Sequence, residues 1–598
     1  MNVLDFETDS IEPYPDFPPK PAGVSIWMEG AEAPHYYAWG HPSGNNCTLS
    51  EATAAVRLAI KGEVVMHNAR FDMAVAEKWM DIKWPKDPLK IHDTLYLNFL
   101  YDVNAPSLSL KPSAERILGI PPDEQTSLQA YLRSQGLREF DYAKVSGELV
   151  APYANGDTFR TRKLFDHTLD YINRKGMLSA YRREQTLAPI LNANERDGIR
   201  VNLPALQRDL EVYEKVFKDV SDLLSTYIGS ANPDSPAELA HALISKGFAK
   251  ESDFLRTEKT KKISTAKASM DRAIGASSLR TILAYRGALK TILSTFMRTW
   301  ERIASQCGGW LHPQFHQVKT DDFGARTGRL SSSDPSFQNV PTEFEIAPPE
   351  GFPPLPLMRQ YVLPDSDDEI ILTSDFNGQE MRVMAHFAEG KAAEIYRENP
   401  RADFHKVASD LIHEATGNEL GRKKVKIIGF TMIYGGGAPV IAERLGIDKD
   451  AATEMKRHYF EAIPGFKQLM EEVSSRGRKG QPVKTWGDRL IYAEPPKMVQ
   501  GRYRDYSYKL VNHLVQGSSA DQTKEAINTA GYRTECKRFM ATVHDENVYS
   551  VKKGRVDAAV MEVKASMEDQ LGWDVPFRVE MKTGDDWHYL SPLPAIPG

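Results

Sequence analysis

The spacing of apolar and polar residues divides the chain into two parts. From residue 1 to about 180, short apolar runs such as EVVMHN alternate with helically spaced segments such as FDMAVAEKWM, which predicts alternating strands and helices. The pattern changes near ERDGIRVN, where Asp197 and Gly198 predict a turn before a short strand. Residues 203 to about 310 then have mainly helical spacing. We therefore expect an α/β domain, followed by a larger region that begins with helices.

The larger region contains two strand-like patterns that lead to acidic residues. IILTSD is an apolar, β-branched run that ends at Asp375, as expected of a buried strand that places one carboxylate at a cleft. FMATVHDENVYSV predicts two short strands, with Asp545 and Glu546 at the turn between them. Taken alone, each pattern is more typical of a solvated strand end or turn. The proline-rich segment 347–357 predicts an irregular linker.

Between these two patterns, Arg422, Lys426, Phe430 and Tyr434 recur at every fourth position. Four residues turn an α-helix by about 400°, so these side chains form one slightly winding stripe. Its cationic half is suited to a triphosphate, and its aromatic half is suited to a sugar and a base. Three glycines that begin at Gly435 then end the helix. The alternative is an amphipathic helix whose aromatic residues belong to the core.

Three acidic elements follow apolar runs or open a helix in the first 160 residues. Asp5 and Glu7 lie two residues apart, so in a strand they point to the same face. Asp72 follows the apolar run before HNARFD, while Tyr153 and Asp157 share one face of a predicted helix. Asp-x-Glu alone is equally typical of a polar strand end.

Clustered carboxylates repel one another unless cations neutralise them. Mg²⁺ and Mn²⁺ are hard ions that prefer such oxygen ligands, and a pair of them can support phosphodiester hydrolysis. The sequence therefore predicts a metal site at these elements. Asp93, in IHDTLYL, is a further acidic candidate, although its position favours a helix cap.

Length and composition set the broad class of the protein. A chain of 598 residues exceeds one hydrophobic core and predicts about three to five domains. Its 41% hydrophobic and 26% charged residues are ordinary for a globular protein, and the sequence contains no apolar run long enough to predict a membrane span or a secretory signal. Three widely spaced cysteines favour a reducing, cytoplasmic setting.

The net charge of −6 argues mildly against a nucleic-acid binder, but its distribution weakens that argument. Residues 1–175 contain 18 basic and 24 acidic side chains, so the whole negative excess lies in the part that contains the predicted metal site. Contact with DNA would then depend on local basic patches. One such cluster comprises Arg256, Lys259, Lys261, Lys262 and Lys267. Taken alone, it is more typical of a solvated helix face or loop.

In order and spacing, the N-terminal elements VLDFET, HNARFD and YANGD resemble the three exonuclease motifs of the DnaQ-like 3′→5′ proofreading family. The resemblance implies that Asp5, Glu7, Asp72 and Asp157 bind metal ions and that Tyr153 orients the attacking water. Only four residues precede Asp5. We therefore expect fraying of the chain end to loosen this ligand.

The segments SDFNGQEMR, RKKVKIIGFTMIYG and VHDE resemble motifs A, B and C of family A DNA polymerases, the DNA polymerase I family, and occur in that family's order. TGRLSSSDPSFQNVP, DFH and VNHLVQGSSAD match as well. The resemblance implies a multidomain α/β and α+β fold, in which a ribonuclease-H-like exonuclease domain precedes a right-hand polymerase. The expected ranges are 1–185 for the exonuclease domain, 186–598 for the polymerase domain, about 203–315 for the thumb, about 316–400 and 500–598 for the palm, and about 400–500 for the fingers.

The resemblance also assigns roles around the predicted polymerase carboxylates. Asp375 and Asp545 would bind two Mg²⁺ ions, with Mn²⁺ as the alternative, and the Phe376 carbonyl would add a ligand. Glu546 would support the site from its edge. Glu380 matches the family's sugar-selecting glutamate, which excludes a ribose 2′-hydroxyl.

In the predicted fingers, the same resemblance assigns contacts with the incoming dNTP. Arg422, Lys426 and His405 would hold its triphosphate, and Lys426 would also donate a proton to pyrophosphate. Phe430 and Tyr434 would close over the nascent base pair. We expect closure of the fingers on a correct nucleotide to bring this stripe onto the metal ions.

DNA contacts are expected from the palm and the thumb. Arg329, Asn512, Gln516 and His544 would touch the primer–template end, partly in the minor groove, where shared acceptors allow a test of pair shape. The resemblance also turns the basic cluster, with Lys261 and Lys262, into a candidate grip on duplex phosphates.

No segment precedes the proofreading motifs in this sequence, and this compact arrangement resembles bacteriophage replicative members of the family. That likeness implies genome replication in a host cytoplasm. The expected partners are primer–template DNA and dNTPs, together with a replisome helicase or a single-strand-binding protein. We expect a monomer that does not associate with membranes.

Three other functions were weighed against this prediction. A single-subunit RNA polymerase shares a similar palm and a Lys…Tyr-Gly helix, but Glu380 and the exonuclease motifs argue against it. A 3′→5′ exonuclease with a DNA-binding C-terminal half would not require Asp375, Lys426 and Asp545 together. A non-enzymatic DNA clamp or scaffold would leave two sets of metal ligands unexplained.

Overall fold

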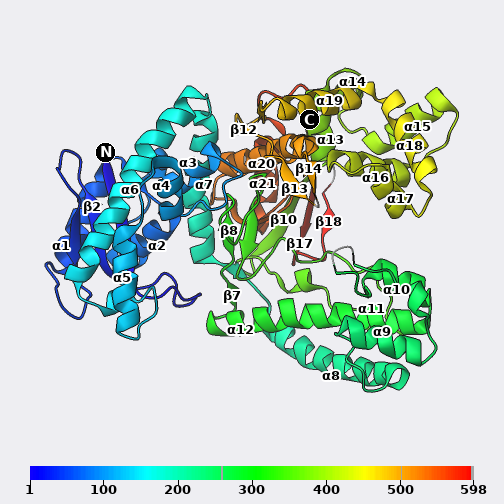
Figure 1. The fold of residues 1–598 in the computed structure, drawn as a ribbon, viewed down its shortest axis with the longest axis horizontal. Helices are drawn as coiled ribbons and strands as arrows, with labels where there is room; N and C mark the ends of the chain where they lie inside the picture. Colours follow the sequence, from blue (N-terminus) through cyan, green and yellow to red (C-terminus); the bar gives the residue numbers. More distant parts are fainter. Residues whose placement is uncertain (258–259, 500, 594–598) are drawn as a thin grey trace.

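The structure is a computed structural model that describes residues 1–257, 260–499 and 501–593. Lys259 of the predicted basic cluster lies outside these residues. Figure 1 shows an N-terminal domain beside a central sheet, from which two mainly helical regions extend. One comprises α8 to α12 and the other α14 to α19.

The N-terminal domain is built on a five-stranded sheet with the order β3-β2-β1-β4-β5. Strand β1 pairs antiparallel with β2 and parallel with β4. Its strands are β1 (Asn2–Thr8), β2 (Pro21–Trp27), β3 (His35–Ala38), β4 (Val64–Met66) and β5 (Ile91–Asp93). Its helices are α1 (Leu49–Lys61), α2 (Ala69–Met80), α3 (Thr94–Tyr101), α4 (Leu110–Leu118), α5 (Asp123–Ser134), α6 (Gly147–Arg174) and α7 (Leu178–Asp197).

The expectation that Asp5 sits on a frayed end is wrong. Strand β1 is the middle strand of its sheet, and Val3, Leu4 and Phe6 are buried. The N-terminal ammonium of Met1 also forms an ion pair with Glu29 at 2.7 Å. Neighbouring strands on both sides therefore fix Asp5, although few residues precede it.

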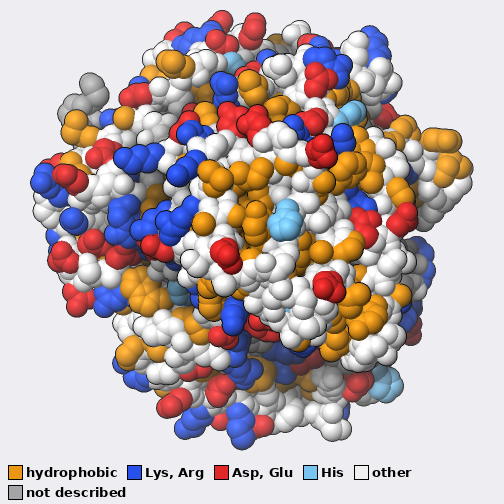
Figure 2. Space-filling model, turned by 90° about the vertical axis from the view of Figure 1, so that its left-hand side faces the viewer, with side chains coloured by type: hydrophobic (Ala, Val, Ile, Leu, Met, Phe, Trp, Pro, Cys, Tyr) orange, Lys and Arg blue, Asp and Glu red, His pale blue; other side chains and the backbone are white. Residues whose placement is uncertain are grey.

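Alternation along β1 separates the apolar core of this domain from its acidic residues. Leu4 and Phe6 belong to a core cluster that includes buried residues of α1 and α2. The side chains of a strand alternate between faces, so Asp5 and Glu7 point to the opposite face, toward α6. Figure 2 shows that the outer surface of this end of the molecule mixes acidic and basic side chains. The acidic character that matters for a metal site therefore lies inside the domain.

The predicted boundary at residue 185 falls inside α7, a continuous helix, so no linker separates the two parts there. Core residues of α3 and α7 belong to the same hydrophobic cluster as the buried strands of the central sheet. We infer that the N-terminal domain and the rest of the chain pack as one unit through α7.

The central sheet has the strand order β15-β16-β10-β17-β18. Both predicted strand patterns are confirmed, because IILTSD lies in β10 and FMATVHDENVYSV forms the β15–β16 hairpin. The elements of this region are β10 (Glu369–Phe376), α13 (Gln379–Ala388), α20 (Leu510–Ala530), β15 (Lys537–Val543), β16 (Glu546–Lys552), α21 (Val556–Glu568), β17 (Val579–Gly584) and β18 (Ser591–Pro592). Segment 347–357 has no regular structure, as predicted.

The two helical regions flank this sheet. The first contains α8 (Leu203–Ile228), α9 (Pro236–Ser245), α10 (Lys267–Ile274), α11 (Ser278–Thr291) and α12 (Arg298–Gln306), which lie in the predicted thumb range. The short strands β6 (Ile199–Arg200), β7 (Trp310–Leu311), β8 (Gln314–His316) and β9 (Ser331–Ser333) precede or follow these helices. The second begins with α14 (Gly390–Glu398), before the predicted fingers range, and continues with α15 (Phe404–Thr416), α16 (Arg422–Ile433), α17 (Ala438–Leu445), α18 (Lys449–Ala462) and α19 (Pro464–Arg478). It is followed by the short strands β11 (Val483–Lys484), β12 (Leu490–Ile491), β13 (Lys497–Val499) and β14 (Arg502–Arg504). Among the described residues, no helix combines the length and apolar character that crossing a membrane requires.

Candidate active sites

The first candidate site is a carboxylate cluster in the N-terminal domain. Asp5 and Glu7 from β1 and Asp157 from α6 each place an oxygen within 4.8 Å of the others. Asp72, at the start of α2, lies beside them and accepts a hydrogen bond from the Phe6 amide at 3.0 Å. Strand periodicity and the helix spacing thus bring the four predicted ligands together, with three of them in mutual reach.

Asp93 is a structural cap, as its position in the sequence favoured. It caps α3 by accepting a hydrogen bond from the Leu95 amide at 2.8 Å. Its two oxygens also accept the Asn68 and Ala69 amides at 2.9 and 2.8 Å. The buried Asp93 carboxylate therefore holds the turn from which α2 presents Asp72.

Lys111, in the first turn of α4, is a member of this site that the sequence analysis missed. Its ammonium lies 2.6 Å from the Asp157 Oδ2 atom, and both side chains are largely buried. It also lies 4.0 Å from the centroid of the Tyr153 ring, which gives a cation–π contact. The cluster therefore contains Lys111 as a built-in positive charge at a predicted metal ligand, and the buried Arg160 lies 3.8 Å from the Asp157 Oδ1 atom as well.

The electrostatics of the cluster favour a bound cation. Burial, together with the charge of Asp157, raises the pKa of Asp5 from 3.8 to about 8. Burial and the neighbouring carboxylates also raise the pKa of Glu7, and burial raises that of Asp72. The Asp157 Oδ1 atom is buried and has no hydrogen-bond partner among the described residues. Hard divalent ions would stabilise the ionised carboxylates and bind the oxygen that lacks a partner, because they neutralise clustered charge and bind carboxylate oxygens.

The second candidate site lies at the end of β10 in the central sheet. Asp375 pairs with Glu546 on one side and with Glu580 on the other. The Phe376 amide donates to the Asp545 carbonyl at 3.4 Å, so the turn after β15 brings Asp545 next to Asp375. Burial, together with the charge of Asp545, raises the pKa of Asp375 to about 8, and burial raises that of Asp545. The two carboxylates predicted from positions 170 residues apart therefore share one site.

Glu546 is held away from this pair by two residues that the sequence analysis did not assign. The Trp587 indole donates to Glu546 Oε1 at 2.9 Å, and the Arg359 guanidinium donates to the same oxygen at 3.2 Å. Arg359 also stacks over the Trp587 ring at 4.1 Å. Arg359 thus compensates the charge of Glu546, whereas Asp375 and Asp545 form no ion pair among the described residues.

The stripe predicted on the helix of residues 422–434 lies on one face of α16. Arg422, Lys426 and Tyr434 are exposed and Phe430 is half-buried, while Val425 and other apolar residues of the helix are buried on the other side. The alternative of an aromatic core face is therefore wrong.

Neighbouring side chains order this stripe. The rings of Phe430 and Tyr434 are stacked with centroids 6.2 Å apart, and the His405 ring lies 5.6 Å from Phe430. Arg422 forms an ion pair with Asp403. Burial lowers the pKa of His405 to about 4, so its imidazole is neutral at pH 7 and available as a hydrogen-bond donor.

Glu380 joins the stripe to the carboxylates. The Tyr434 hydroxyl donates to its two oxygens at 3.1 and 3.2 Å, and Arg329 forms an ion pair with it. The charges of Arg329 and Glu380 both influence the pKa of Asp545, so this network borders the carboxylate pair of Asp375 and Asp545. Arg329, predicted to contact DNA, is thus engaged with the predicted sugar-selecting residue.

A sequence model of DNA polymerase family A matches residues 204–589, well over half of the chain. The chain belongs to DNA polymerase family A.

Individual family A proteins and one solved structure are also similar to this chain. "DNA polymerase I, thermostable" of Thermus filiformis is 28% identical over 488 residues, which cover 79% of this chain and 55% of the relative. DNA polymerase I of Geobacillus stearothermophilus is 28% identical over 417 residues, which cover 68% and 45%. This chain thus spans about half the length of these curated relatives.

The solved structure is the POL domain of Pol1 from M. smegmatis, in complex with a DNA primer–template and dNTP. It has a TM-score of 0.76 at 21% identity and covers 95% of this chain and 93% of that chain. Since the sequence identity is low, this likeness concerns the fold.

The remaining predicted DNA contacts of this family A chain lie at the β15–β16 turn, on α20, or in the loop before α10. His544, at the tip of the β15–β16 turn, has a φ of 60° and lines a small pocket with Arg329. Asn512 and Gln516 lie one turn apart on α20 and are partly exposed. Lys261 and Lys262 are exposed in the loop before α10.

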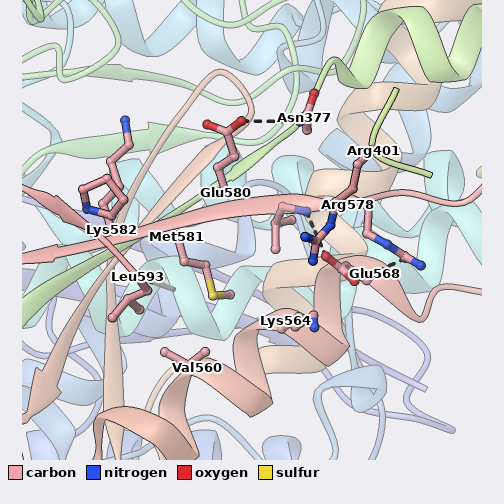
Figure 3. Close-up of a pocket in the computed structure, with 12 residues that line it drawn as sticks. Asn377, Arg401, Val560, Lys564, Glu568, Arg578, Glu580, Met581, Lys582 and Leu593 are labelled. Carbon is pink, nitrogen blue, oxygen red and sulfur yellow. Dashed lines mark hydrogen bonds and ion pairs between the residues drawn. The ribbon is translucent and has the colours of Figure 1, made fainter. Parts of the chain in front are cut away.

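A separate pocket of about 320 Å³ opens beside β17 and α21. Figure 3 shows Asn377 directed toward Glu580, and Arg578 directed toward Glu568, with which it forms an ion pair at 3.3 Å. Asn377 follows Phe376 directly, and Glu580 pairs with Asp375 in the sheet. This pocket therefore borders the carboxylate strand but uses none of the predicted site residues.

Proposed function

We propose that this chain is a template-directed DNA polymerase that adds dNTPs to a primer 3′ end by two-metal-ion phosphoryl transfer. The observation that best supports this proposal is that Asp375 and Asp545 lie next to each other. The network of Glu380, Arg329 and Tyr434 borders them. A polymerase requires both an acidic pair and a nucleotide-binding stripe. Membership of family A supports the same reaction.

Asp375 and Asp545 are the residues that would hold Mg²⁺, with Mn²⁺ as the alternative, and the Phe376 carbonyl is a further candidate ligand. The fit rests on the raised pKa of both carboxyl groups and on the Asp375 Oδ1 atom, which is buried without a hydrogen-bond partner among the described residues. When bound, such ions lower the pKa of a coordinated hydroxyl or water and neutralise charge on the phosphate.

The other residues of this site bind and orient the substrates. Arg422, Lys426 and the neutral His405 would hold the triphosphate, and Lys426 would protonate the departing pyrophosphate. Phe430 and Tyr434 would stack on the nascent pair when the fingers close.

Contacts with the sugar and the DNA complete the proposed polymerase site. Glu380, fixed by Tyr434, would leave no room for a ribose 2′-hydroxyl. Asn512, Gln516, His544 and Arg329 would contact the primer–template end, and Lys261 and Lys262 would contact duplex phosphates.

We further propose that the N-terminal domain, with its β3-β2-β1-β4-β5 sheet, is a ribonuclease-H-like 3′→5′ proofreading exonuclease. Asp5, Glu7, Asp72 and Asp157 would hold its Mg²⁺ ions, and Tyr153 would orient the attacking water. The approach of three carboxylates to within 4.8 Å supports this assignment. Genome replication of the bacteriophage type would explain the pairing of the two activities in one monomer, alongside a helicase or a single-strand-binding protein.

Primer extension tests both activities in one experiment. A labelled primer–template with a matched or a mismatched 3′ end is incubated with Mg²⁺, with and without dNTPs. We expect extension of the matched end and shortening of the mismatched end before extension. Degradation without extension would leave a nuclease only, and preference for rNTPs over dNTPs would indicate an RNA polymerase.

A further inference from the structure

A groove between the N-terminal domain and the polymerase region is lined by residues that neighbour members of the carboxylate cluster along the chain. It has a volume of about 770 Å³, within the range of ligand-binding pockets. On one side it is lined by Asn68, Arg70 and Phe71, which precede Asp72, and by Leu108, Ser109 and Leu110, which precede Lys111. On the other side it is lined by residues 314–316 and 320–323 of the polymerase region. The lining therefore includes the residues directly before Asp72 and Lys111, two members of the cluster.

The polymerase side of the groove is a tight turn that reaches across to the N-terminal domain. The Thr320 amide donates to the Phe323 carbonyl at 2.7 Å, and the Phe323 amide donates to the Thr320 hydroxyl at 3.0 Å. Asp321, at the tip, accepts the hydroxyls of Ser107 and Ser109 at 2.7 and 3.0 Å. It also accepts the Leu108 amide at 3.3 Å. Hydrogen bonds between the two domains thus hold the 320–323 turn against the segment directly before α4.

The residues before this turn are anchored more deeply. The Gln317 carbonyl accepts the buried Lys524 ammonium at 2.7 Å, and the Gln317 side chain accepts the Tyr96 hydroxyl at 2.7 Å. The His316 ring contacts the Ser333 hydroxyl at 2.9 Å. The turn is therefore a rigid extension of the polymerase region.

Phe323 forms an aromatic platform on this turn. Its ring stacks on His316 with centroids 4.6 Å apart and an interplanar angle of 6°. Phe323 is nevertheless 44% exposed, and Phe140 on the opposite side of the groove is 65% exposed. Large aromatic rings exposed around one groove indicate a binding surface.

The chemistry of the lining indicates which part of a nucleic acid it binds. Arg70 is engaged by Glu195 and by the Phe315 carbonyl, and the Asp321 carboxylate is used by its three donors. These residues would therefore offer little free positive charge to neutralise the phosphates of a nucleic acid. Exposed aromatic faces stack on any base, and this interaction requires bases that are not paired.

We propose that this groove binds the unpaired nucleotides of a DNA 3′ end, with a base stacked on Phe323, and leads them to the carboxylate cluster. The proposal rests on the proposed exonuclease function. It adds a contribution of the polymerase region, the turn at 320–323, to the binding of the strand that the N-terminal domain would edit. A frayed primer end and a free single strand both present unpaired bases at a 3′ end, so both are candidate ligands.

Binding is tested without hydrolysis, in the presence of EDTA. The probe is a single-stranded oligonucleotide with 2-aminopurine at its 3′-terminal or its 5′-terminal base, and a second probe is a primer–template with a mismatched 3′ end. We compare the unsubstituted protein with Phe323→Ala, with Phe323→Tyr, and with the matched control Phe159→Ala. Phe159 is 38% exposed on α6 and lies outside the lining of the groove.

We expect 3′-labelled probes to be quenched on binding and Phe323→Ala to weaken their affinity at least about fivefold, since stacking of one base contributes at least that much. Phe323→Tyr retains the ring and should bind like the unsubstituted protein, as should Phe159→Ala. The double substitution Ser107→Ala/Ser109→Ala, made in the other domain, should reproduce part of the loss because it removes hydrogen bonds to Asp321.

Equal affinity of Phe323→Ala and the unsubstituted protein, or equal quenching of 3′- and 5′-labelled probes, would overturn the proposal. A loss confined to the single strand would exclude the frayed primer end as its ligand. Adding Mg²⁺ to the unsubstituted protein then tests the exonuclease separately. Binding without degradation would reject the exonuclease function but retain the proposed binding in the groove. Degradation together with unchanged binding by Phe323→Ala would retain the exonuclease function but reject the proposed binding in the groove.

Discussion

In the N-terminal domain, the Lys111 ammonium contacts Asp157, which is itself a predicted metal ligand. In the central sheet, the Arg359 guanidinium contacts Glu546, which only borders the predicted ligands Asp375 and Asp545. The ion pairs of the two acidic centres are thus placed differently. Lys111 pairs with a predicted metal ligand, which Arg160 also approaches at 3.8 Å, whereas Arg359 pairs with a neighbour of the predicted ligands.

The two centres also differ in the structural elements that supply their predicted ligands. The N-terminal cluster draws Asp5 and Glu7 from one strand and Asp157 from a long helix, all inside one domain. The pair in the central sheet comes from the end of β10 and the turn between β15 and β16. The first centre is therefore assembled by packing of a helix on a sheet, and the second by pairing of strands within one sheet.

The largest expected effect separates the two centres completely. Asp545→Asn should lower primer extension at least about a thousandfold, because it removes one of the two predicted metal-binding carboxylates, and should spare degradation of a single strand. Asp157→Asn should have the opposite effect. Rates of extension and degradation are measured for both variants on the same DNA. Loss of both activities in either variant would mean that the centres are not independent.

Lys111→Met should reduce degradation about 10- to 100-fold, the usual cost of losing a partner that orients a metal ligand. The reason is that the buried Asp157 carboxylate loses its ion pair and its position. Lys111→Arg keeps the charge and should recover part of the activity. Extension of a matched primer is the internal control. If Lys111→Met degraded DNA at the normal rate, the ion pair would have no part in the reaction.

Arg359→Gln should slow nucleotide addition about tenfold, a smaller effect because Trp587 still donates to Glu546. The released charge of Glu546 would act on Asp375, so the change should appear in kcat and in the Mg²⁺ requirement. The KM for dNTP should stay nearly constant, since the stripe on α16 is untouched. A rise in KM alone would show that Arg359 acts on nucleotide binding instead.

The candidate ligands could be predicted from the sequence because local periodicity determines them. Two-residue spacing in a strand placed Asp5 and Glu7 on one face, and four-residue spacing in a helix placed Lys426, Phe430 and Tyr434 in one stripe. Apolar runs that end in acids located Asp375 and the hairpin with Asp545.

The residues that sequence reasoning missed act through contacts that no local pattern records. Lys111 lies in SLSLKPSAERIL, a segment of ordinary polarity, and reaches Asp157 only because α4 packs on α6. Arg359 and Trp587 are far apart in sequence and meet at Glu546. The error about Asp5 has the same origin, since the pairing of β1 with β2 and β4 depends on residues elsewhere in the chain.

The smallest expected effect is a dependence of thermal stability on pH and Mg²⁺. In the folded protein the pKa of Asp5 and that of Asp375 are each raised from 3.8 to about 8. Between these values the folded state binds more protons than the unfolded state, so without metal the stability falls as pH rises from about 4 to about 8. Mg²⁺ binds the deprotonated carboxylates and offsets this loss.

The rise in Tm caused by Mg²⁺ should therefore be larger at pH 8.5 than at pH 6.5, by about 1–2 °C. Calorimetry with Mg²⁺ or EDTA at both pH values measures it. The charge of Lys111 lowers the pKa of Asp5 and Glu7, so Lys111→Met should enlarge the pH dependence. Arg359 is not a neighbour of that cluster, so Arg359→Gln should leave this contribution unchanged. An equal response of the two variants would remove the distinction between a cation inside the ligand set and one beside it.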